Sequence, residues 1–578
     1  MPATLQLHHE RVDDIPLLWG VVQQLGLPEL LERHLGSHHF HQGLTNGTLA
    51  AVWIAALLSQ ANHCKVTVQD WAQRHHHTLQ TLLGQELRPV EFSDDRLGIL
   101  LKRFHHADWE ALEADLWQAT CQVYQLPLDC VRLDSSTSFG YHTPTADGLL
   151  QFGHSKDHRP DLPQLKLMAA AAQPTCQLIA CDLHPGNAAD DPLYLPLIRR
   201  VRRQLQRQGL LYCGDCKMAA LATRAEVVAG HDYYLMPLPK VGDNAAQIET
   251  WIEEALAGKY PRQELTRVND KREVELFAYG YEQERVCVAE VDQQRLAWTE
   301  RVQIVQSLAL AQRQAEQLEK RLGQAERALR ALTPAPGQGR KQQRVEEELR
   351  RAVATIMQEH EVSGLLRVGW EAEQEEQRRY QGRGRPRAQQ TACVEVRVRY
   401  VIKAVGREEE RIAAAKQRYG WRVQVTNMPA TRCDLLAAVL LYNGGWSVER
   451  DFHLLKDLPL GIQPLYVREE EQIGGLTKLL TIALRVLTLI ELQVRAGLQE
   501  AGEELAGLYE GQAKRATSRP TSVRLLKAIA RLEITVTRLE TEEEVGWHLT
   551  PLPPLVQRIL GFLKLPWTLY TCLADESG

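Results

Sequence analysis

The stretch PLDCVRLD, residues 127–134, decides the fold, because it is an extended, partly alternating run that ends on an acidic residue. Such a run predicts a β-strand. Two further strands are predicted in LKLMAAAAQ (165–173) and QLIACDLH (177–184), joined by a tight connection at Pro174 and Thr175. We therefore expect a three-stranded meander in this part of the chain.

Helices and strands alternate after the meander. A helix is expected to begin near Asp190–Asp191, because Asp is a favourable N-cap and Pro192 suits a first helical turn. The next segments predict a strand, a helix and a strand: GLLYCGD (209–215), KMAALATRAEVV (217–228) and DYYLMPL (232–238). A meander that feeds parallel units in this order predicts an α/β fold, with a mixed sheet flanked by helices.

The chain of 578 residues is too long for one hydrophobic core and is expected to form several domains. Its longest apolar run, 479–492, contains Arg485 and Glu491, so no membrane-spanning helix is predicted. The N-terminal residues lack the pattern of a signal peptide, and the eleven scattered cysteines favour a reducing compartment. We expect a cytoplasmic protein with no membrane partner.

The domain organisation is predicted from changes in the apolar pattern. Residues 1–120 and 471–578 carry apolar side chains at steps of three and four, which predicts helical N- and C-terminal regions. Residues 241–395 predict an insertion of strands plus a helical hairpin, with apolar seams from Ile304 to Leu332 and from Val345 to Ile356. The α/β core is then expected in two parts: 121–240 and 396–470.

The net charge of −5 opposes nucleic-acid binding unless positive charge gathers locally, since phosphate binding relies on Lys and Arg. Two clusters meet this condition: LIRRVRRQLQRQG (197–209) and RRYQGRGRPR (378–387). The second has the arginine-flanked Gly-Arg-Pro core of a minor-groove reader, with Arg383, Arg385 and Arg387 as DNA contacts. A flexible basic linker is the alternative for so short a motif.

Two carboxylates end predicted strands. Asp134 closes the first strand and Asp215 the fourth, and side chains at the carboxyl ends of strands face the crevice of an open α/β sheet. A crossover helix lets the fourth strand lie beside the first, so the two carboxylates would repel each other unless a cation lay between them. Oxygen ligands of this kind suit Mg²⁺. The alternatives are a turn-forming Asp134 and a helix-capping Asp215.

The stretch LYNGGWSVERDFHLLKD, residues 441–457, supplies a third carboxylate. Apolar side chains at Val448, Phe452 and Leu455 predict a helix, and its spacing places Glu449 and Lys456 two turns apart on one side. Glu449 then completes a two-metal site suited to in-line displacement at phosphorus. A solvated Glu and Lys on an ordinary amphipathic helix is the alternative.

The motif CGDC (213–216) offers a different chemistry, since Cys-x-x-Cys at a strand-to-helix junction suits thiol redox or zinc. A zinc site needs two more ligands, and the sequence has no second such pair. The adjacent histidines of the N-terminal region, such as His75, His76 and His77, point in different directions on a helix and do not predict a metal site.

Several ordered blocks together resemble one known family. Tyr442, Glu449 and Lys456 have the spacing of a signature in which Tyr, Arg, Glu and Lys are separated by two, three and six residues, with Gly445 at the Arg position. Four further blocks fit the same family: LDSS at Asp134, GHSKDHRPDLPQ (153–164), PGNAADD (185–191) and the GD-x-K-M of Asp215. The chain thus resembles bacterial insertion-sequence transposases of the DDE type, in the Y-R-E-K subgroup, which have an RNase H-like catalytic core.

The resemblance implies metal-dependent hydrolysis of a phosphodiester at a transposon end, followed by strand transfer into target DNA. Asp134, Asp215 and Glu449 would hold two Mg²⁺ ions, or Mn²⁺ in their place. DNA contacts are expected from the residues that match the family blocks: Tyr442, Trp446, Arg450, Lys456, Lys156 and Arg159. Among these, Tyr442 and Lys456 would hold phosphates, Trp446 would stack on a base, and Arg450 would reach the region that the missing arginine leaves.

The implied partners are double-stranded DNA, as terminal inverted repeats and as target, and a second copy of the chain in a synaptic homodimer. The N-terminal helical region would read the repeats in the bacterial, nucleoid-associated cytoplasm. Three alternatives stay open: a nuclease of the same fold without joining activity, a catalytically inactive DNA-binding relative, and a helical scaffold built on the 304–356 hairpin.

Overall fold

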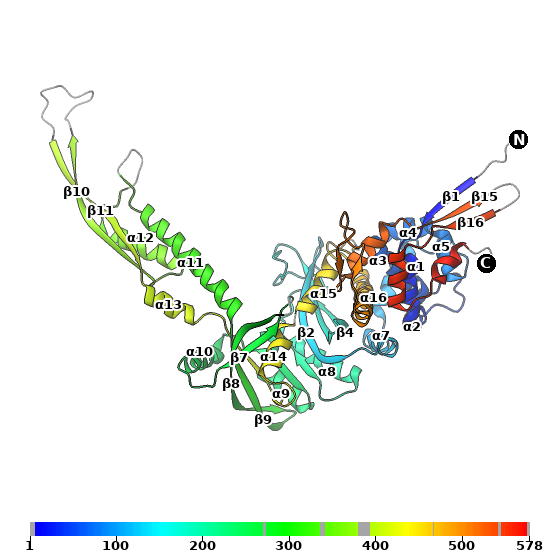
Figure 1. Ribbon diagram of the computed structural model, residues 1–578, viewed down its shortest axis with the longest axis horizontal. Coiled ribbons are helices and arrows are strands. Elements are labelled where there is room, and N and C mark those ends of the chain that lie inside the picture. The colour runs from blue at the N-terminus through cyan, green and yellow to red at the C-terminus, as the bar shows by residue number, and fades with distance from the viewer. Residues whose placement is uncertain are drawn as a thin grey trace.

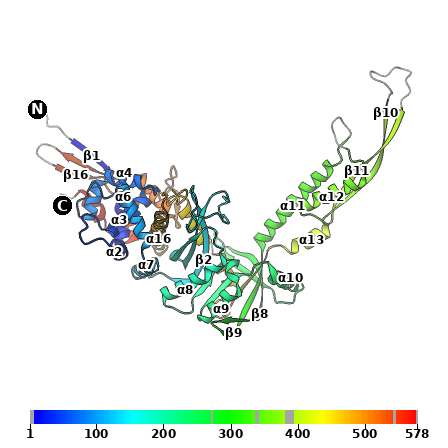
Figure 2. The same cartoon turned by 180° about the vertical axis from the view of Figure 1, so that it is seen from behind.

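The computed structural model describes residues 6–574, apart from 270–272, 336–341, 380–392, 445, 466 and 541–544. Three parts follow one another along its long axis: a helical body, a large sheet with its covering helices, and a long arm (Figure 1). Figure 2 shows the same order from behind.

The central sheet has nine strands. In spatial order they are β4 (Gln177–Pro185), β3 (Gln164–Pro174), β2 (Leu128–Phe139), β5 (Leu211–Cys213), β6 (Tyr233–Pro237), β12 (Trp421–Thr426), β9 (Gln294–Ser307), β8 (Val274–Val291) and β7 (Gln263–Val268). Strands β2, β5 and β6 are parallel, and every other neighbouring pair is antiparallel. The predicted meander, the crossover that brings β5 beside β2, and the RNase H-like arrangement are therefore confirmed.

Side chains of β3 alternate between two cores, as the period of two in a strand requires. Met168 and Ala170 pack in the core under α8 (Tyr194–Leu205) and α9 (Leu221–Ala229), whereas Leu167 and Ala169 pack in the core that contains α16. Helices thus cover this part of the sheet on both faces, which is why β3 is apolar along most of its length.

The two ends of the chain form one helical body rather than two separate regions. Its helices are α1 (Ile15–Gln24), α2 (Leu27–Leu35), α3 (Asn46–Gln60), α4 (Lys65–Arg74), α5 (His76–Leu83), α6 (Asp94–His106), α7 (Trp109–Tyr124), α16 (Glu470–Ala501), α17 (Ser522–Ala530), α18 (Pro554–Leu563) and α19 (Thr568–Thr571). In Figure 1 the blue N-terminal helices lie among the orange and red C-terminal ones. Strand β1 (Gln6–Arg11) also pairs with β15 (Thr535–Glu540), which pairs with β16 (Val545–Leu549), and a short ladder joins β13 (Leu505–Ala506) to β14 (Ala516–Thr517).

Helix α16 is the central element of this body. Among the described residues it is the one helix long and apolar enough to cross a membrane, but 94% of its apolar window is buried inside the structure. Its Arg485 and Glu491 are buried in ion pairs with other helices. The helix is therefore accounted for as the core of the body.

The predicted insertion divides between the sheet and the arm. Strands β7, β8 and β9 extend the sheet beyond β12, and α10 (Gly242–Leu256) lies beside them. The arm contains α11 (Leu308–Ala331), α12 (Glu346–Glu359), β10 (Leu366–Arg379), β11 (Cys393–Arg407) and α13 (Glu409–Gln417).

The helical hairpin of α11 and α12 is confirmed, since Leu318, Leu322 and Leu329 pack against Leu349 and Val353. The start of its seam was predicted wrongly. Ile304 lies in β9, where it pairs with Val423 and Tyr281, because an apolar run such as VQIV is satisfied as well by a central strand as by a helix. The GRGRPR motif, with Arg383, Arg385 and Arg387, lies outside the described residues.

Candidate active site

Asp134 and Asp215 occupy matching positions on two neighbouring strands. The parallel ladder pairs Val131 with Tyr212 and Arg132 with Cys213, so two residues further along each chain bring Asp134 level with Asp215. Strand β5 ends at Cys213, whereas β2 continues to Phe139 and does not end at Asp134 as predicted. Asp134 therefore lies on the edge of β2 that β5 leaves open.

Both aspartates point toward the same face of the sheet. Val131 and Leu133 pack under α8, so the alternation of β2 turns Asp134 to the opposite face, and Asp215, two residues beyond the end of β5, lines the same cavity as Asp134. That face is covered by α14 (Leu435–Asn443) and α15 (Trp446–Lys456).

Helix α15 brings Glu449 to this edge. Val448, Phe452 and Leu455 are buried and fix the orientation of the helix, so Glu449 lies exposed on another face. Asp134, Asp215 and Glu449 line one cavity of about 280 Å³, together with Arg132, Arg422, Tyr442 and Asn443. Three carboxylates that are far apart in the sequence thus share one hollow.

The charges in this hollow are not balanced. The pKa of Asp134 is raised to about 6. Burial is the main cause and the negative charges of Asp215 and Glu449 add to it, whereas Lys156 and a hydrogen bond from the Ser135 backbone N–H lower it. Lys156 Nζ lies 3.8 Å from Asp134 Oδ1 and donates to Ser135 Oγ at 2.6 Å. Arg132 and Arg422 also line the cavity, but among the described residues Asp215 and Glu449 form no ion pair and Asp134 has only Lys156 at 3.8 Å. Carboxylates left in this state favour binding of a positive ion.

Asp215 combines two roles. Its Oδ1 accepts a hydrogen bond from the backbone N–H of Lys217 at 2.9 Å, so it does cap the turn η2 (Cys216–Ala219), as the alternative interpretation proposed. The same oxygen accepts from the Tyr194 hydroxyl at 2.7 Å. Burial, with the charge of Asp215, raises the pKa of Tyr194, so this hydroxyl stays protonated and remains a donor.

A second hollow of about 410 Å³ adjoins the first, because Asp134 and Glu449 line both. It is also lined by Lys156, Phe452, His453 and Lys456, so the expectation that Glu449 and Lys456 share a helix side is confirmed. Lys456 Nζ lies 2.6 Å from Asp157 Oδ1, and Gln463 donates to the other oxygen of Asp157 at 3.0 Å. The ammonium of Lys456 is therefore held at the hollow by a carboxylate that a bound phosphate would compete with.

The donor set suits a hard divalent cation, since it consists of carboxylate oxygens whose charges repel one another. Within the described residues, however, no group of three His, Cys, Asp or Glu side chains is arranged to hold a metal ion as it stands. This includes the cysteines of CGDC, which were considered as zinc ligands. Cys213 is buried in an apolar cluster with Cys130 and Cys433.

The other predicted contacts are distributed more widely. Tyr442 lines the carboxylate cavity, with the Arg132 guanidinium 5.9 Å from its ring centre. Arg159 pairs with Asp161 at 2.8 Å and lies over the Phe139 ring. Arg450 does not line either hollow; it pairs with Glu491 on α16 instead. The side chain of Trp446 lies outside the described part of the structure.

Sequence reasoning missed Arg422, Asn443 and Asp157, which line these hollows, and Tyr194, which contacts Asp215. For two of these residues, the sequence contains a feature that could have identified them. Asn443 directly follows Tyr442, and Arg422 alternates with buried residues in the predicted strand WRVQVTN. The sequence contains no such feature for Tyr194, because this residue reaches Asp215 only through the packing of α8 on the sheet.

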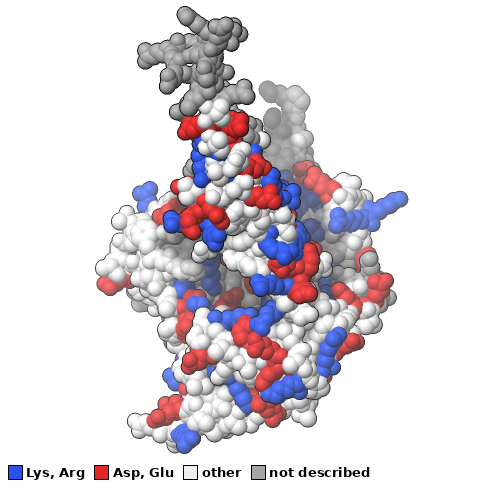
Figure 3. Space-filling model, turned by 90° about the vertical axis from the view of Figure 1, so that its left-hand side faces the viewer, with Lys and Arg blue, Asp and Glu red and all other residues white. Residues whose placement is uncertain are grey.

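The arginine-rich helix predicted as a DNA-binding cluster is α8, and its charges are already paired. Ion pairs join Arg199 to Glu226 at 2.9 Å, Arg200 to Glu113 at 2.5 Å, Arg202 to Asp232 at 2.9 Å and Arg203 to Glu110 at 2.8 Å. On the face shown in Figure 3, Lys and Arg also alternate with Asp and Glu. Arginine-rich sequence alone therefore does not mark a positive surface here.

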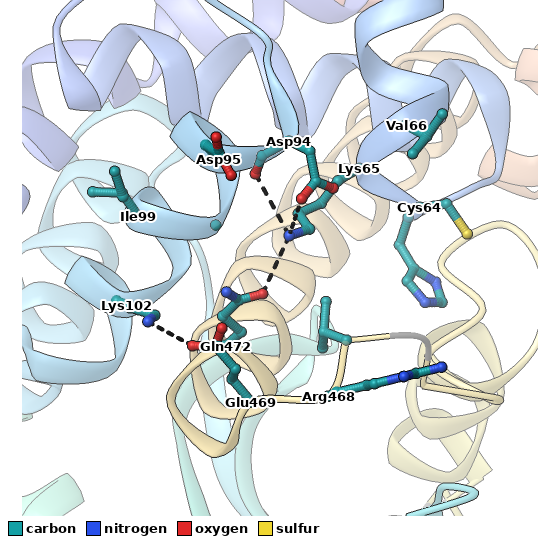
Figure 4. Close-up of a pocket in the computed structure, with 13 residues that line it drawn as sticks. Cys64, Lys65, Val66, Asp94, Asp95, Ile99, Lys102, Arg468, Glu469 and Gln472 are labelled. Atoms are coloured by element: carbon teal, nitrogen blue, oxygen red, sulfur yellow. Dashed lines mark hydrogen bonds and ion pairs between the residues drawn. The ribbon is translucent and has the colours of Figure 1, made fainter.

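A separate cavity of about 770 Å³ lies where α4 and α6 begin and α16 starts (Figure 4). Lys65 Nζ lies 3.0 Å from Asp94, and Lys102 Nζ lies 2.5 Å from Glu469. Because these charges balance in pairs, the cavity lacks the crowded carboxylates of the sheet edge.

Comparison with known proteins gives two family matches. The family model described as transposase DDE domain matches residues 130–485, and a domain of unknown function, DUF4277, matches residues 7–117. No curated protein matches the sequence. Among solved structures, the cryo-EM structure of a piggyBac transposase synaptic complex with hairpin DNA is similar at 9% identity, over 95% of this chain and 85% of that chain, with a TM-score of 0.30. A structural similarity this low carries no argument by itself, whereas the first family match spans more than half of the chain.

Proposed function

Because the chain belongs to the transposase DDE domain family, we propose that Asp134, Asp215 and Glu449 are its catalytic carboxylates. The protein is a transposase, an enzyme of DNA cleavage and strand transfer that depends on divalent metal ions. The observation that supports the assignment is the single cavity that all three carboxylates line. The raised pKa of Asp134 agrees with the assignment: burial is its main cause, and the negative charges of Asp215 and Glu449 add to it.

Mg²⁺ is the ion we propose, with Mn²⁺ as a substitute, held by Asp134, Asp215 and Glu449. When bound, such ions activate an attacking oxygen and stabilise the leaving oxygen of an in-line displacement at phosphorus. The Tyr194 hydroxyl and the Lys217 backbone N–H both donate to Oδ1 of Asp215, and we propose its other oxygen as the metal ligand. Lys156, beside Asp134, supplies positive charge at the site before a cation arrives.

Substrate phosphates are proposed to bind on the two sides of the carboxylates. On one side, Tyr442 and Arg422 line the smaller cavity. On the other, Lys456 would exchange its ion pair with Asp157 for a DNA phosphate. We keep the Y-R-E-K subgroup as a proposal, with Gly445 at the position of its arginine.

The wider assembly is also proposed. The helical body, whose N-terminal part matches DUF4277, would bind the terminal inverted repeats, and a homodimer would join two transposon ends. The bacterial nucleoid is the expected setting. Joining activity separates this function from that of a nuclease, which would release nicked DNA without strand-transfer products.

The decisive experiment compares Glu449→Gln with the unaltered protein on labelled transposon-end DNA and Mg²⁺. We expect the variant to fold normally and to lose both cleavage and strand transfer. Glu359→Gln, the same substitution at an exposed position near the end of α12, is the matched control and should leave both activities unchanged. A folded Glu449→Gln protein that cleaves at the normal rate would overturn the site assignment.

A further inference from the structure

A groove of about 800 Å³ lies next to the carboxylate cavity, on the other side of Gly444. It is lined by the turn between β3 and β4, by the second half of α16 and by residues 502–504 and 518–519. Helices α15 and α16 lie side by side here (Figure 1). None of the residues assigned above to metal or phosphate binding lines this groove except Arg450.

One side chain separates the groove from the carboxylate cavity. Gln173 Oε1 accepts hydrogen bonds from Arg132, which lines the cavity, at 3.3 and 3.4 Å. Its Nε2 donates to the Gly444 carbonyl at 3.1 Å, and both of these residues line the groove. A polymer that occupies the cavity therefore has the groove as its neighbouring surface.

Positive charge exceeds negative charge in the groove. Arg450 and Arg495 share the buried carboxylate of Glu491, which lies 2.7 Å from Arg495. Arg519 is exposed, and among the described residues it forms no ion pair. Burial lowers the pKa of Arg495, and the positive charges of Arg450 and Arg519 lower it further, against the attraction of Glu491.

The acidic residues on the rim do not remove this excess. Glu503 pairs with Arg558 at 2.6 Å, which leaves Glu504 and the shared Glu491 against three guanidinium groups. Asp451 also lies 3.4 Å from Arg450, but burial raises its pKa to about 8, so it is mostly uncharged at pH 7. Like charges held this close favour a bound anion, and the planar donors of Arg suit the oxygens of a phosphodiester.

The positive surface continues along the chain from the groove. The segment KRATSRPTSVRLLKAIAR, residues 514–531, carries six Lys and Arg and no Asp or Glu. Arg515 and Arg524 lie over the ring of Tyr509, at 4.0 and 4.3 Å from its centre. Within the described residues, Lys514, Arg515 and Arg524 form no ion pair with a carboxylate, unlike the arginines of α8.

We propose that the groove and the segment Lys514–Arg524 bind the phosphate backbone of the DNA that flanks the scissile phosphodiester. This inference rests on the transposase function proposed above. Arg495 and Arg519 contact phosphates next to the carboxylate cavity, and Arg515 and Arg524 contact phosphates further along the same duplex. Arg450 anchors the groove through Glu491 rather than touching DNA.

The test is binding of the full chain to a fluorescent DNA duplex of arbitrary sequence, because backbone contacts do not depend on sequence. We expect Arg515→Glu/Arg519→Glu to weaken binding about tenfold, and Arg519→Gln alone to reduce the dependence of log Kd on log salt by about one unit. Arg207→Glu is the matched control: Arg207 is exposed, forms no ion pair among the described residues, and precedes β5, at the opposite end of that strand from Asp215. It should bind within about twofold of the unaltered protein.

The outcomes separate this inference from the function on which it rests. If both groove variants bind the duplex normally and the protein cleaves transposon-end DNA, the proposal that the groove binds DNA is wrong. The assignment of the catalytic carboxylates would be unaffected. Failure of the unaltered protein to bind or cleave DNA would overturn both. Arg519→Gln changes an exposed side chain, so it reports on binding even if the double charge reversal unfolds the protein.

Discussion

Two sets of buried or half-buried charges lie at different places on the same sheet, one beside the edge strand β4 and the other where β5 ends next to β2, and their surroundings differ. Glu113 of α7 is fully buried, and it accepts hydrogen bonds from Arg200 at 2.5 Å, from Arg485 and from the Cys181 backbone N–H at 3.0 Å. At the open edge of β2, by contrast, Asp134 has Asp215 and Glu449 for neighbours and Lys156 at 3.8 Å.

This difference separates charges that stabilise the fold from charges that remain available to bind a ligand. The carboxylate of Glu113 joins α7, α8, α16 and β4, and every charge in that cluster has an opposite charge beside it. A charge can be buried when an opposite charge lies beside it, and removal of one partner of such a pair lowers the stability of the protein. The three carboxylates of the sheet edge are crowded together, and among the described residues only Asp134 has an ion-pair partner, Lys156 at 3.8 Å. Such crowding suits a site that must attract cations.

The largest expected effect is that of Asp134→Asn. We expect cleavage of transposon-end DNA to fall by about a thousandfold or more, because several kcal/mol of metal-dependent stabilisation depend on this ligand. The melting temperature should stay the same or rise, since the change removes one of three repelling charges. Single-turnover cleavage and thermal melting measure the two effects, and a large loss of stability would make Asp134 a structural residue like Glu113.

The converse is expected for Glu113→Gln. It should lower the free energy of unfolding by about 3–5 kcal/mol, because the buried Arg485 would lose its ion-pair partner and Arg200 would keep only Asp182. Urea unfolding measures the loss, with Glu110→Gln as control, since Glu110 pairs with Arg203 at the surface. Cleavage per folded molecule should be unchanged. A stable but inactive variant would show that Glu113 acts in cleavage rather than in stabilising the fold.

Asp14 offers an intermediate case, a buried carboxylate that accepts from the Ser59 hydroxyl and forms no ion pair among the described residues. Burial raises its pKa from 3.8 to about 6. The folded protein thus binds this proton more tightly than the unfolded chain, so the contribution of Asp14 to stability falls as the pH rises from about 4 to about 6.

Asp14→Asn removes this pH dependence. Relative to the variant, the unaltered protein should lose about 3 kcal/mol of stability between pH 4 and pH 7. Urea unfolding at several pH values measures the difference, with Asp70→Asn, at an exposed position on α4, as control. An unchanged difference across this range would show that Asp14 is ionised in the folded state at pH 4.

The smallest effects are expected on α8. Arg199→Ala should change duplex-DNA affinity less than about twofold and stability by less than about 1 kcal/mol, because the side chain is half-exposed and already paired with Glu226. Fluorescence anisotropy and urea unfolding measure these effects. A strong loss of DNA binding would show that the ion pair of Arg199 with Glu226 opens in the complex. Arginines that are paired in the free protein could then also bind DNA.

The sequence by itself determined the order of the core elements. The meander, the crossover to the fourth strand, and the helix that carries Glu449 are confirmed, since each rests on a local pattern of apolar side chains and turn residues. The same patterns predicted that Asp134 and Asp215 would lie near each other, because strands that share a crossover place their carboxyl ends together.

Only the tertiary structure decided which charges remain free. The arginines of α8 and those of the 514–531 segment are alike in the sequence, yet the first set meets Glu110, Glu113, Glu226 and Asp232 from distant segments. Arg450 likewise turns to Glu491 on α16 rather than to the cavity of its neighbour Glu449. Local periodicity fixes the face on which a side chain lies, but its partner comes from packing between elements far apart in the chain, and the partner decides whether the charge can act on a ligand.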